Sequence, residues 1–153
     1  MSDNRDVVSV DRVINATPDA IFALLADPRR HRDFDGSGTV GEAKDLPDRL
    51  RLGSKFGMSM KQGVSYSMVN EVVEFEEGRR IAWKPHMKAF AWVSGGRVWR
   101  YELEPVDGGT RVTETWDITH EKSKVFVRAA GKKTRANMEA TLARLDEIAT
   151  APA

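Results

Sequence analysis

The middle of the chain, residues 39–119, consists of short segments in which apolar and polar residues alternate, and no helical pattern separates them. Alternation of this kind is typical of half-buried strands. Closely spaced strands without intervening helices favour an antiparallel sheet. In the clearest segment, residues 54–61, the alternation places Phe56, Met58 and Met60 on one face. Asp107-Gly108-Gly109 then predicts a hairpin between the last two strands.

Helical patterns are confined to the two ends of the chain. After a β-branched segment at residues 7–14, Thr17-Pro18 and Asp27-Pro28 each pair a good N-cap with a proline in the first turn, which predicts two short helices. A long terminal helix is expected over about residues 122–149, with an interruption at Gly131. We therefore expect an α+β fold in which a curved antiparallel sheet wraps around the terminal helix. The apolar stripe of that helix consists of Phe126, Ala130, Thr134, Met138, Thr141, Leu142, Leu145 and Ile148.

Composition limits the class of protein. The 153 residues suit one domain, expected over residues 1–153 with an ordered core of about 5–149. The chain has no cysteine and a net charge of +1, which excludes thiolate chemistry and disfavours a wholly basic nucleic-acid binder. No apolar run is long enough to span a bilayer, and the first residues lack a signal-peptide pattern, so we expect a cytoplasmic protein.

Several segments resemble one known superfamily. Residues 16–28, ATPDAIFALLADP, followed by Phe34-Asp35-Gly36, are similar to the opening of START-like (SRPBCC, Bet v 1-like) proteins, and the closest branch is the bacterial polyketide cyclase/dehydrase-like proteins. Residues 73–83, residues 110–117 and the terminal helix agree with it. The resemblance implies a helix-grip fold with an apolar cavity between sheet and helix. It implies no universal catalytic motif, so activity has to be argued from the site.

Strand alternation predicts which side chains line that cavity. Trp99 and Tyr101 share one face of their strand, and Glu114 and Trp116 share one face of the next. The long strand changes parity, so we expect a bulge near Asn70. Clustered tryptophans and methionines suit either ordinary core packing or a pocket for a flat or lipid-like ligand. The predicted ligand-binding residues are Met58, Met60, Tyr66, Met68, Trp83, Trp99, Tyr101, Glu114, Trp116, Phe126 and Asn137.

Glu114 is the most informative polar residue because its parity points it inward. A buried carboxylate needs a partner or becomes protonated. Tyr101, Tyr66 and Asn137 are the candidate partners, whereas Arg100 has the opposite parity and is expected to face solvent. Glu114 is either structural, a ligand anchor, or an acid/base group acting with Tyr101.

Two functions from different classes follow. The first is a carrier or sensor that binds a small hydrophobic molecule, lipid-like or aromatic and polyketide-like, without a cofactor. The alternative is a cofactor-independent cyclase or dehydratase that uses Glu114 and Tyr101. His31, His86 and His120 do not have the spacing of a metal site, although His86, expected in a loop after Trp83, is in reach of the cavity mouth. The sequence does not distinguish a monomer from a dimer.

A third function is weaker. Six of the seven basic residues after position 120 lie between Lys122 and Arg135 without an acid among them. This segment is either a solvated helix face or a rim that attracts an anionic group. RNA binding also requires exposed aromatic residues among the basic ones, and only Phe126 qualifies, so no nucleic-acid partner is expected.

Overall fold

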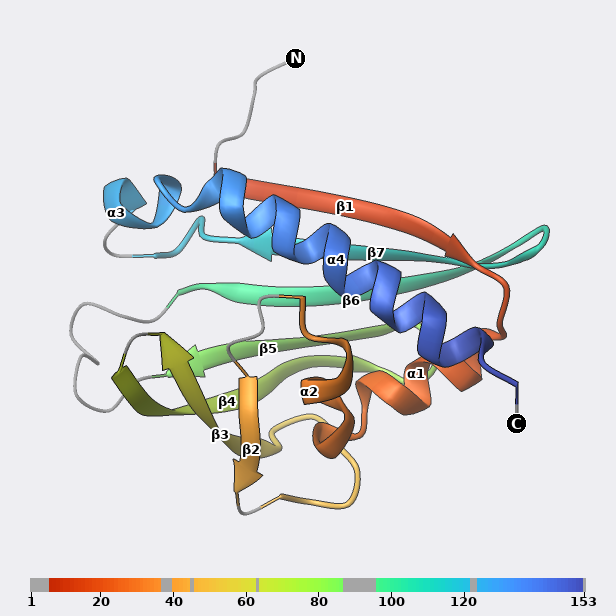
Figure 1. Cartoon of the computed structure of the whole chain (residues 1–153), viewed down its shortest axis with the longest axis horizontal. Helices are drawn as coiled ribbons and strands as arrows, with labels where there is room; N and C mark the ends of the chain where they lie inside the picture. Colours follow the sequence, from red (N-terminus) through yellow and green to blue (C-terminus); the bar gives the residue numbers. More distant parts are fainter. Residues whose placement is uncertain are drawn as a thin grey trace.

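The computed structural model describes residues 6–36, 40–44, 46–62, 64–86, 96–121 and 124–152. Seven strands in these residues form one antiparallel sheet with the order β1-β7-β6-β5-β4-β3-β2 (Figure 1). The sequence-based α+β helix-grip prediction is confirmed. The strands are β1 (Val7–Ile14), β2 (Val40–Lys44), β3 (Lys55–Gln62), β4 (Val64–Glu76), β5 (Arg80–His86), β6 (Val98–Val106) and β7 (Gly109–Asp117). The helices are α1 (Pro18–Leu25), η1 (Pro28–Arg30), α2 (His31–Phe34), α3 (Lys124–Arg128) and α4 (Gly131–Thr150).

The short helices after β1 begin where the cap-and-proline pairs predict. The Thr17 side chain accepts a hydrogen bond from the backbone N–H of Ala20 at 3.2 Å, which starts α1. The Asp27 side chain accepts from the N–H of Arg29 at 3.0 Å, which starts η1. Each cap pairs a backbone N–H that has no partner inside its helix. The caps thereby place α2 directly after η1, with His31 and Phe34 buried.

Helix α4 crosses one face of the sheet, which we call the inner face (Figure 1). Met138, Thr141, Leu142 and Leu145 of α4 are buried. Helix α4 lies alongside β1. Arg135 of α4 donates to the carbonyl of Ser9, and Arg12 of β1 forms an ion pair with Asp146 of α4. The buried apolar residues of strands and helices form one cluster. Burial of this cluster is the main stabilising contribution to the fold.

The terminal helix is divided, as its glycine suggested. Residues 124–128 form α3, and α4 begins at Gly131 itself. A Cβ atom at Gly131 would meet nothing within 4 Å, so the glycine does not mark a close backbone approach. Ala130, which the predicted stripe included, is exposed, because the buried face begins only further along α4.

The bulge in β4 lies three residues beyond the expected position. The register between β4 and β5 shifts between Val72 and Glu74, so Val73 is the extra residue, not Asn70. Asn70 and Val72 are buried and share the inner face, whereas Val73 is 36% exposed. After the bulge Phe75 returns to the inner face and contacts Phe22 of α1, with ring centroids 5.5 Å apart. The bulge therefore keeps Val72 and Phe75, on either side of it, on the inner face.

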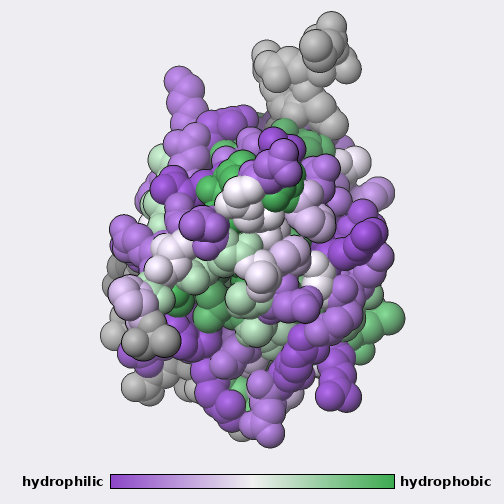
Figure 2. All heavy atoms as spheres, turned by 90° about the vertical axis from the view of Figure 1, so that its right-hand side faces the viewer, coloured by the Kyte–Doolittle hydropathy of each residue, from purple (hydrophilic) through white to green (hydrophobic). Residues whose placement is uncertain are grey.

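The surface at the end of the molecule that contains α1 and the C-terminal end of α4 is mostly hydrophilic, with a smaller group of hydrophobic residues among the hydrophilic ones (Figure 2).

None of the helices in the described part of the chain combines the length and the apolar character that crossing a bilayer requires.

Candidate functional site

Three tryptophans lie side by side across the inner face. Trp83 on β5 pairs in register with Trp99 on β6, and Trp99 pairs with Trp116 on β7. Directly opposite residues of antiparallel strands point to the same face, so the three side chains lie on the inner face. The rings of Trp99 and Trp116 are 6.2 Å apart at 41°. Trp83 and Trp116 are 9% and 2% exposed, whereas Trp99 between them is only half-buried.

The adjacent position along the same strands holds a polar pair. Tyr101 on β6 and Glu114 on β7 lie opposite each other in register. The Tyr101 hydroxyl donates a hydrogen bond to Oε1 of Glu114 at 2.8 Å. Both side chains are buried, at 4% and 3% exposure. Of the three candidate partners for Glu114, the structure selects Tyr101, and it also places Glu114 inward as its parity predicts.

Burial controls the protonation of this pair. It raises the pKa of the Glu114 carboxyl from 4.5 to about 8; the hydrogen bond from Tyr101 acts in the opposite direction, and the negative charge of Asp35 adds to the increase. Burial, followed by the charge of Glu114 and their hydrogen bond, raises the pKa of Tyr101 well above 10. At neutral pH the Tyr101 hydroxyl is therefore protonated, and Glu114 is mostly a neutral acid.

Among the described residues of this face, two polar atoms have no hydrogen-bond partner. They are Oε2 of Glu114 and the indole Nε1 of Trp116, and each is fully buried. Most buried polar atoms in folded proteins are paired, and an unpaired one costs free energy. Both atoms belong to inward-facing residues of β7 that are two positions apart. The row formed by Trp83, Trp99 and Trp116, which we call the tryptophan row, thus includes and adjoins buried polar atoms that can still form hydrogen bonds.

His31 of α2 covers the row from the helical side. Its ring stacks on Trp83 with centroids 4.8 Å apart at 23°, and it contacts Phe34 and Phe56 at 5.4 and 5.3 Å. Nε2 donates to the carbonyl of Leu25 at 2.8 Å when it carries the ring proton. Burial lowers the pKa of His31 from 6.5 to about 4, so the ring is neutral at pH 7. Sequence reasoning did not place His31 at the site; the spacing of His31 and Phe34 on one helical face was the available signal.

Asp35 was also not predicted as part of the site. It is half-buried at the end of α2, and its charge acts on both Tyr101 and Glu114. The next residue, Gly36, donates its backbone N–H to the Thr141 hydroxyl at 2.8 Å, and Arg144 donates to the Asp35 carbonyl at 2.6 Å. Two contacts with α4 therefore hold this end of α2 beside the polar pair.

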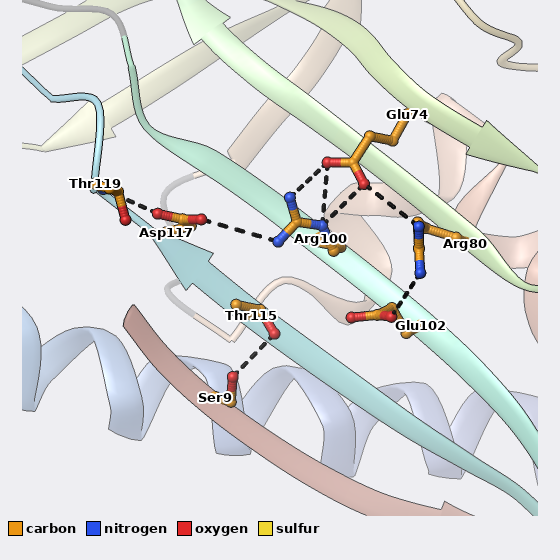
Figure 3. Close-up of polar contacts among 8 residues, drawn as sticks. All are labelled: Ser9, Glu74, Arg80, Arg100, Glu102, Thr115, Asp117 and Thr119. Atoms are coloured by element: carbon orange, nitrogen blue, oxygen red, sulfur yellow. Dashed lines mark hydrogen bonds and ion pairs between the residues drawn. The ribbon is translucent and has the colours of Figure 1, made fainter. Parts of the chain in front are cut away.

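The opposite, outer face of the sheet carries charged residues instead. Arg100 lies there as predicted, and it donates to Glu74 at 2.5 and 3.1 Å and lies 4.0 Å from Asp117 (Figure 3). Arg80 pairs with Glu102 at 3.2 Å in the same network. These partly exposed ion pairs contribute little stability each. A groove of about 280 Å³ beside them is lined by Glu76, Arg79, Arg80, Glu102, Leu103, Glu104 and Thr113.

For several predicted ligand-binding residues, the structure describes the backbone but not the side chain. The side chains of Met58, Met60, Tyr66, Met68 and Phe126 lie outside the described residues. The backbone register pairs Met58 with Met68 and Met60 with Tyr66 across β3 and β4.

Two other candidates are described. Asn137 is half-buried on α4, and its carbonyl accepts from Thr141. His86 ends β5 as an exposed residue; the prediction that it lies in a loop is wrong, because the strand continues to it.

Much of the basic terminal segment is used within the fold. Arg128 and Lys124 pair with Asp6 at 2.7 and 3.4 Å. Within residues 6–36, 40–44, 46–62, 64–86, 96–121 and 124–152, no three His, Asp or Glu side chains gather in a way that would hold a metal ion.

The sequence and the fold both match known proteins. A family model described as "Polyketide cyclase / dehydrase and lipid transport" matches residues 5–150. The uncharacterized protein Rv0088 of Mycobacterium tuberculosis is 37% identical over 136 residues, which are 83% of this chain and 57% of that protein. A second Mycobacterium tuberculosis protein, MT0096, is 39% identical with the same coverage. The chain thus spans 57% of the length of these curated relatives.

Solved structures of low identity share the fold. A solution structure from Arthrobacter aurescens has a TM-score of 0.74 at 16% identity, covering 97% of this chain and 88% of that one. The crystal structure of DynU16, from the dynemicin biosynthetic locus, has a TM-score of 0.67 at 16% identity, covering 95% and 48%. Since the family model covers residues 5–150, the chain belongs to the polyketide cyclase/dehydrase and lipid transport family.

Proposed function

We propose that this chain is a single ligand-binding domain that holds a small hydrophobic molecule, lipid-like or aromatic, between the inner face of the sheet and α4, as a carrier or sensor. The observation that carries the proposal is the tryptophan row. Its outer members, Trp83 and Trp116, are buried, but Trp99 in the middle keeps exposed surface although it faces inward. A flat apolar ligand would cover that surface and stack on the indoles.

Membership of the family supports this function, because its description includes lipid transport. The chemistry of the face agrees. The aromatic side chains of Trp83, Trp99, Trp116 and Tyr101 provide apolar area, and the Glu114 carboxyl provides orientation. Binding sites for small molecules commonly combine a mostly apolar lining with a few polar groups.

Native mass spectrometry of the gently purified protein tests the proposal. We expect a co-purified small molecule, or a rise in melting temperature with lipids, sterols or aromatic polyketides. Binding should also quench tryptophan fluorescence. Trp116→Ala should weaken binding by about 1–3 kcal/mol, the value expected for a lost aromatic contact. A protein that never carries a ligand and shows no thermal shift with any of these classes would contradict the proposal.

The second candidate is a cyclase or dehydratase. Glu114 favours it specifically, since an acid with a pKa of about 8 and a fixed partner at 2.8 Å is suited to proton transfer near neutral pH. DynU16, which shares the fold, comes from a biosynthetic locus. Glu114→Gln discriminates the two functions. Lost turnover of a polyketide substrate with retained binding favours the enzyme, and unchanged turnover excludes Glu114 as its acid/base group.

A further inference from the structure

The unused hydrogen bonds of the inner face indicate what kind of polar group the ligand carries. Oε2 of Glu114 and Nε1 of Trp116 are the relevant atoms, and both are buried without a partner. Leaving such atoms unpaired costs free energy, and a ligand that pairs them recovers it. The two residues face the same side of β7, next to the half-buried ring of Trp99. A molecule stacked on Trp99 would therefore lie on the same face as both atoms, next to the residue that carries one of them and one register pair from the other.

Each of these atoms is a hydrogen-bond donor at neutral pH. An indole nitrogen only donates. Oε1 of Glu114 accepts a hydrogen bond from the Tyr101 hydroxyl. Because burial keeps the carboxyl mostly protonated, the other oxygen, Oε2, carries the acid proton. Two donors without an acceptor require an acceptor from the ligand.

We propose that the ligand carries a neutral carbonyl oxygen, and that Glu114, as a protonated acid, and Trp116 donate hydrogen bonds to it. This inference rests on the proposed function and adds the chemical class of the ligand. The negative charge of Asp35 acts on Glu114, so an anionic ligand beside Glu114 would lie near a like charge. The partial positive charge of the Trp116 indole N–H would repel a cationic ligand.

Matched probes test the polar group apart from the apolar body. The first pair is 2-acetylnaphthalene and 2-isopropenylnaphthalene, which differ only in C=O against C=CH2. The second pair, 2-undecanone and 2-methyl-1-undecene, makes the same comparison on a lipid-like chain. Equilibrium dialysis at pH 6.5 should give about tenfold tighter binding of the ketone than of the alkene, which corresponds to about threefold for each of the two hydrogen bonds. The pair with the higher overall affinity distinguishes an aromatic from a lipid-like ligand.

Variants of the two donors should remove this preference. Glu114→Leu and Trp116→Phe each delete a donor, and the ketone should lose several-fold of its advantage over the alkene. Glu114→Gln keeps an N–H donor for the ligand and an acceptor for Tyr101, so the preference should remain. Thr115→Val is the matched control, since Thr115 lies between the two on β7 but faces outward, where its hydroxyl contacts Ser9 Oγ at 3.0 Å (Figure 3). This control should bind both probes like the wild type.

The pH dependence provides an independent readout. The titratable groups that act on Glu114 are Tyr101 on β6 and Asp35 at the end of α2, while its neighbour on β1, Val10, is apolar. Tyr101 stays protonated because its pKa is well above 10. With a Glu114 pKa of about 8, ketone affinity should fall several-fold between pH 6.5 and 9.5, toward that of Glu114→Leu, because the ionised carboxylate no longer donates. Glu114→Gln should bind the ketone equally at both pH values.

The outcomes separate this inference from the function it rests on. Equal affinity for ketone and alkene in both pairs, with binding retained, overturns the carbonyl proposal and leaves hydrophobic binding intact. Tighter binding of 1-(2-naphthyl)ethylammonium than of 2-acetylnaphthalene also overturns it, since Glu114 would then act as an anion. Failure of every probe to bind contradicts the proposed function itself.

Discussion

The hydroxyl of Tyr101 donates to Oε1 of Glu114 at 2.8 Å between directly opposite residues of β6 and β7, on the buried face of the sheet. A tyrosine hydroxyl pairs with a carboxyl in either protonation state, but it does not supply the countercharge that an ionised carboxylate needs away from water. The effect of burial on the pKa of Glu114 is therefore larger than that of the hydrogen bond, and the acid stays mostly protonated up to about pH 8.

The first prediction concerns stability against pH. Because folding raises the pKa of Glu114 from 4.5 to about 8, the folded state binds one more proton than the unfolded state between these values. The contribution of Glu114 to stability is complete below pH 4.5 and is lost as pH rises to 8, by at most about 1.4 kcal/mol per pH unit. Glu114→Gln should lack this decline in urea unfolding at pH 5.5–8.5. The exposed Glu139→Gln is the control, and parallel curves for wild type and Glu114→Gln would refute the assignment.

A second prediction applies to the acid side. Folding lowers the pKa of His31 from 6.5 to about 4, so the unfolded state binds the extra proton in that range. Stability due to His31 is present above pH 6.5 and is lost as pH falls toward 4. His31→Phe should flatten this loss and lower stability at pH 7 by about 1–3 kcal/mol, because the Leu25 carbonyl loses its donor. Urea unfolding at pH 4.5–7 measures both effects, with exposed His86→Gln as the control. If the free energy of unfolding of His31→Phe fell with pH as steeply as that of the wild type, the lowered pKa assigned to His31 would be wrong.

The third prediction compares two glycines. A Cβ at Gly36 would lie 2.2 Å from the Asn137 carbonyl oxygen and 2.6 Å from the Thr141 backbone nitrogen on α4. Backbone atoms of a packed helix do not move cheaply, so Gly36→Ala should destabilise the protein by about 1–3 kcal/mol. Gly131→Ala should be neutral or stabilising by up to about 1 kcal/mol, because the site is open and helical. Chemical unfolding of both variants gives the comparison; equal effects would mean that the loop after α2 does not pack against α4 as described.

The fourth prediction tests the packing of α4. Leu145 is fully buried, and Leu145→Asp places a carboxylate there without a partner. The cost is several kcal/mol against a total stability of about 5–15 kcal/mol, so cooperative folding should be lost. Leu52 is 66% exposed, and Leu52→Asp should change stability by less than about 0.5 kcal/mol. Thermal unfolding monitored by circular dichroism distinguishes them. A cooperatively folded Leu145→Asp protein of unchanged stability would be incompatible with α4 on the inner face.

Alternation and capping predicted much of the fold. β1 has the predicted bounds, α1 begins at its predicted cap, and Tyr101, Glu114 and Trp116 face inward as their parity indicates. These features depend on neighbours within a few positions of the chain, which is why the sequence alone determines them.

Other features depend on residues far apart in the sequence. Alternation indicated a change of parity in β4, but the pairing with β5 determined that the bulge falls at Val73. The choice of Tyr101 as the partner of Glu114, the stacking of His31 on Trp83, and the action of Asp35 on the pair all join separate elements. Register, packing and the exclusion of water decided them. The sequence therefore determined which side chains of β6 and β7 face inward, and the tertiary structure decided which of them meet and which of them keep their protons.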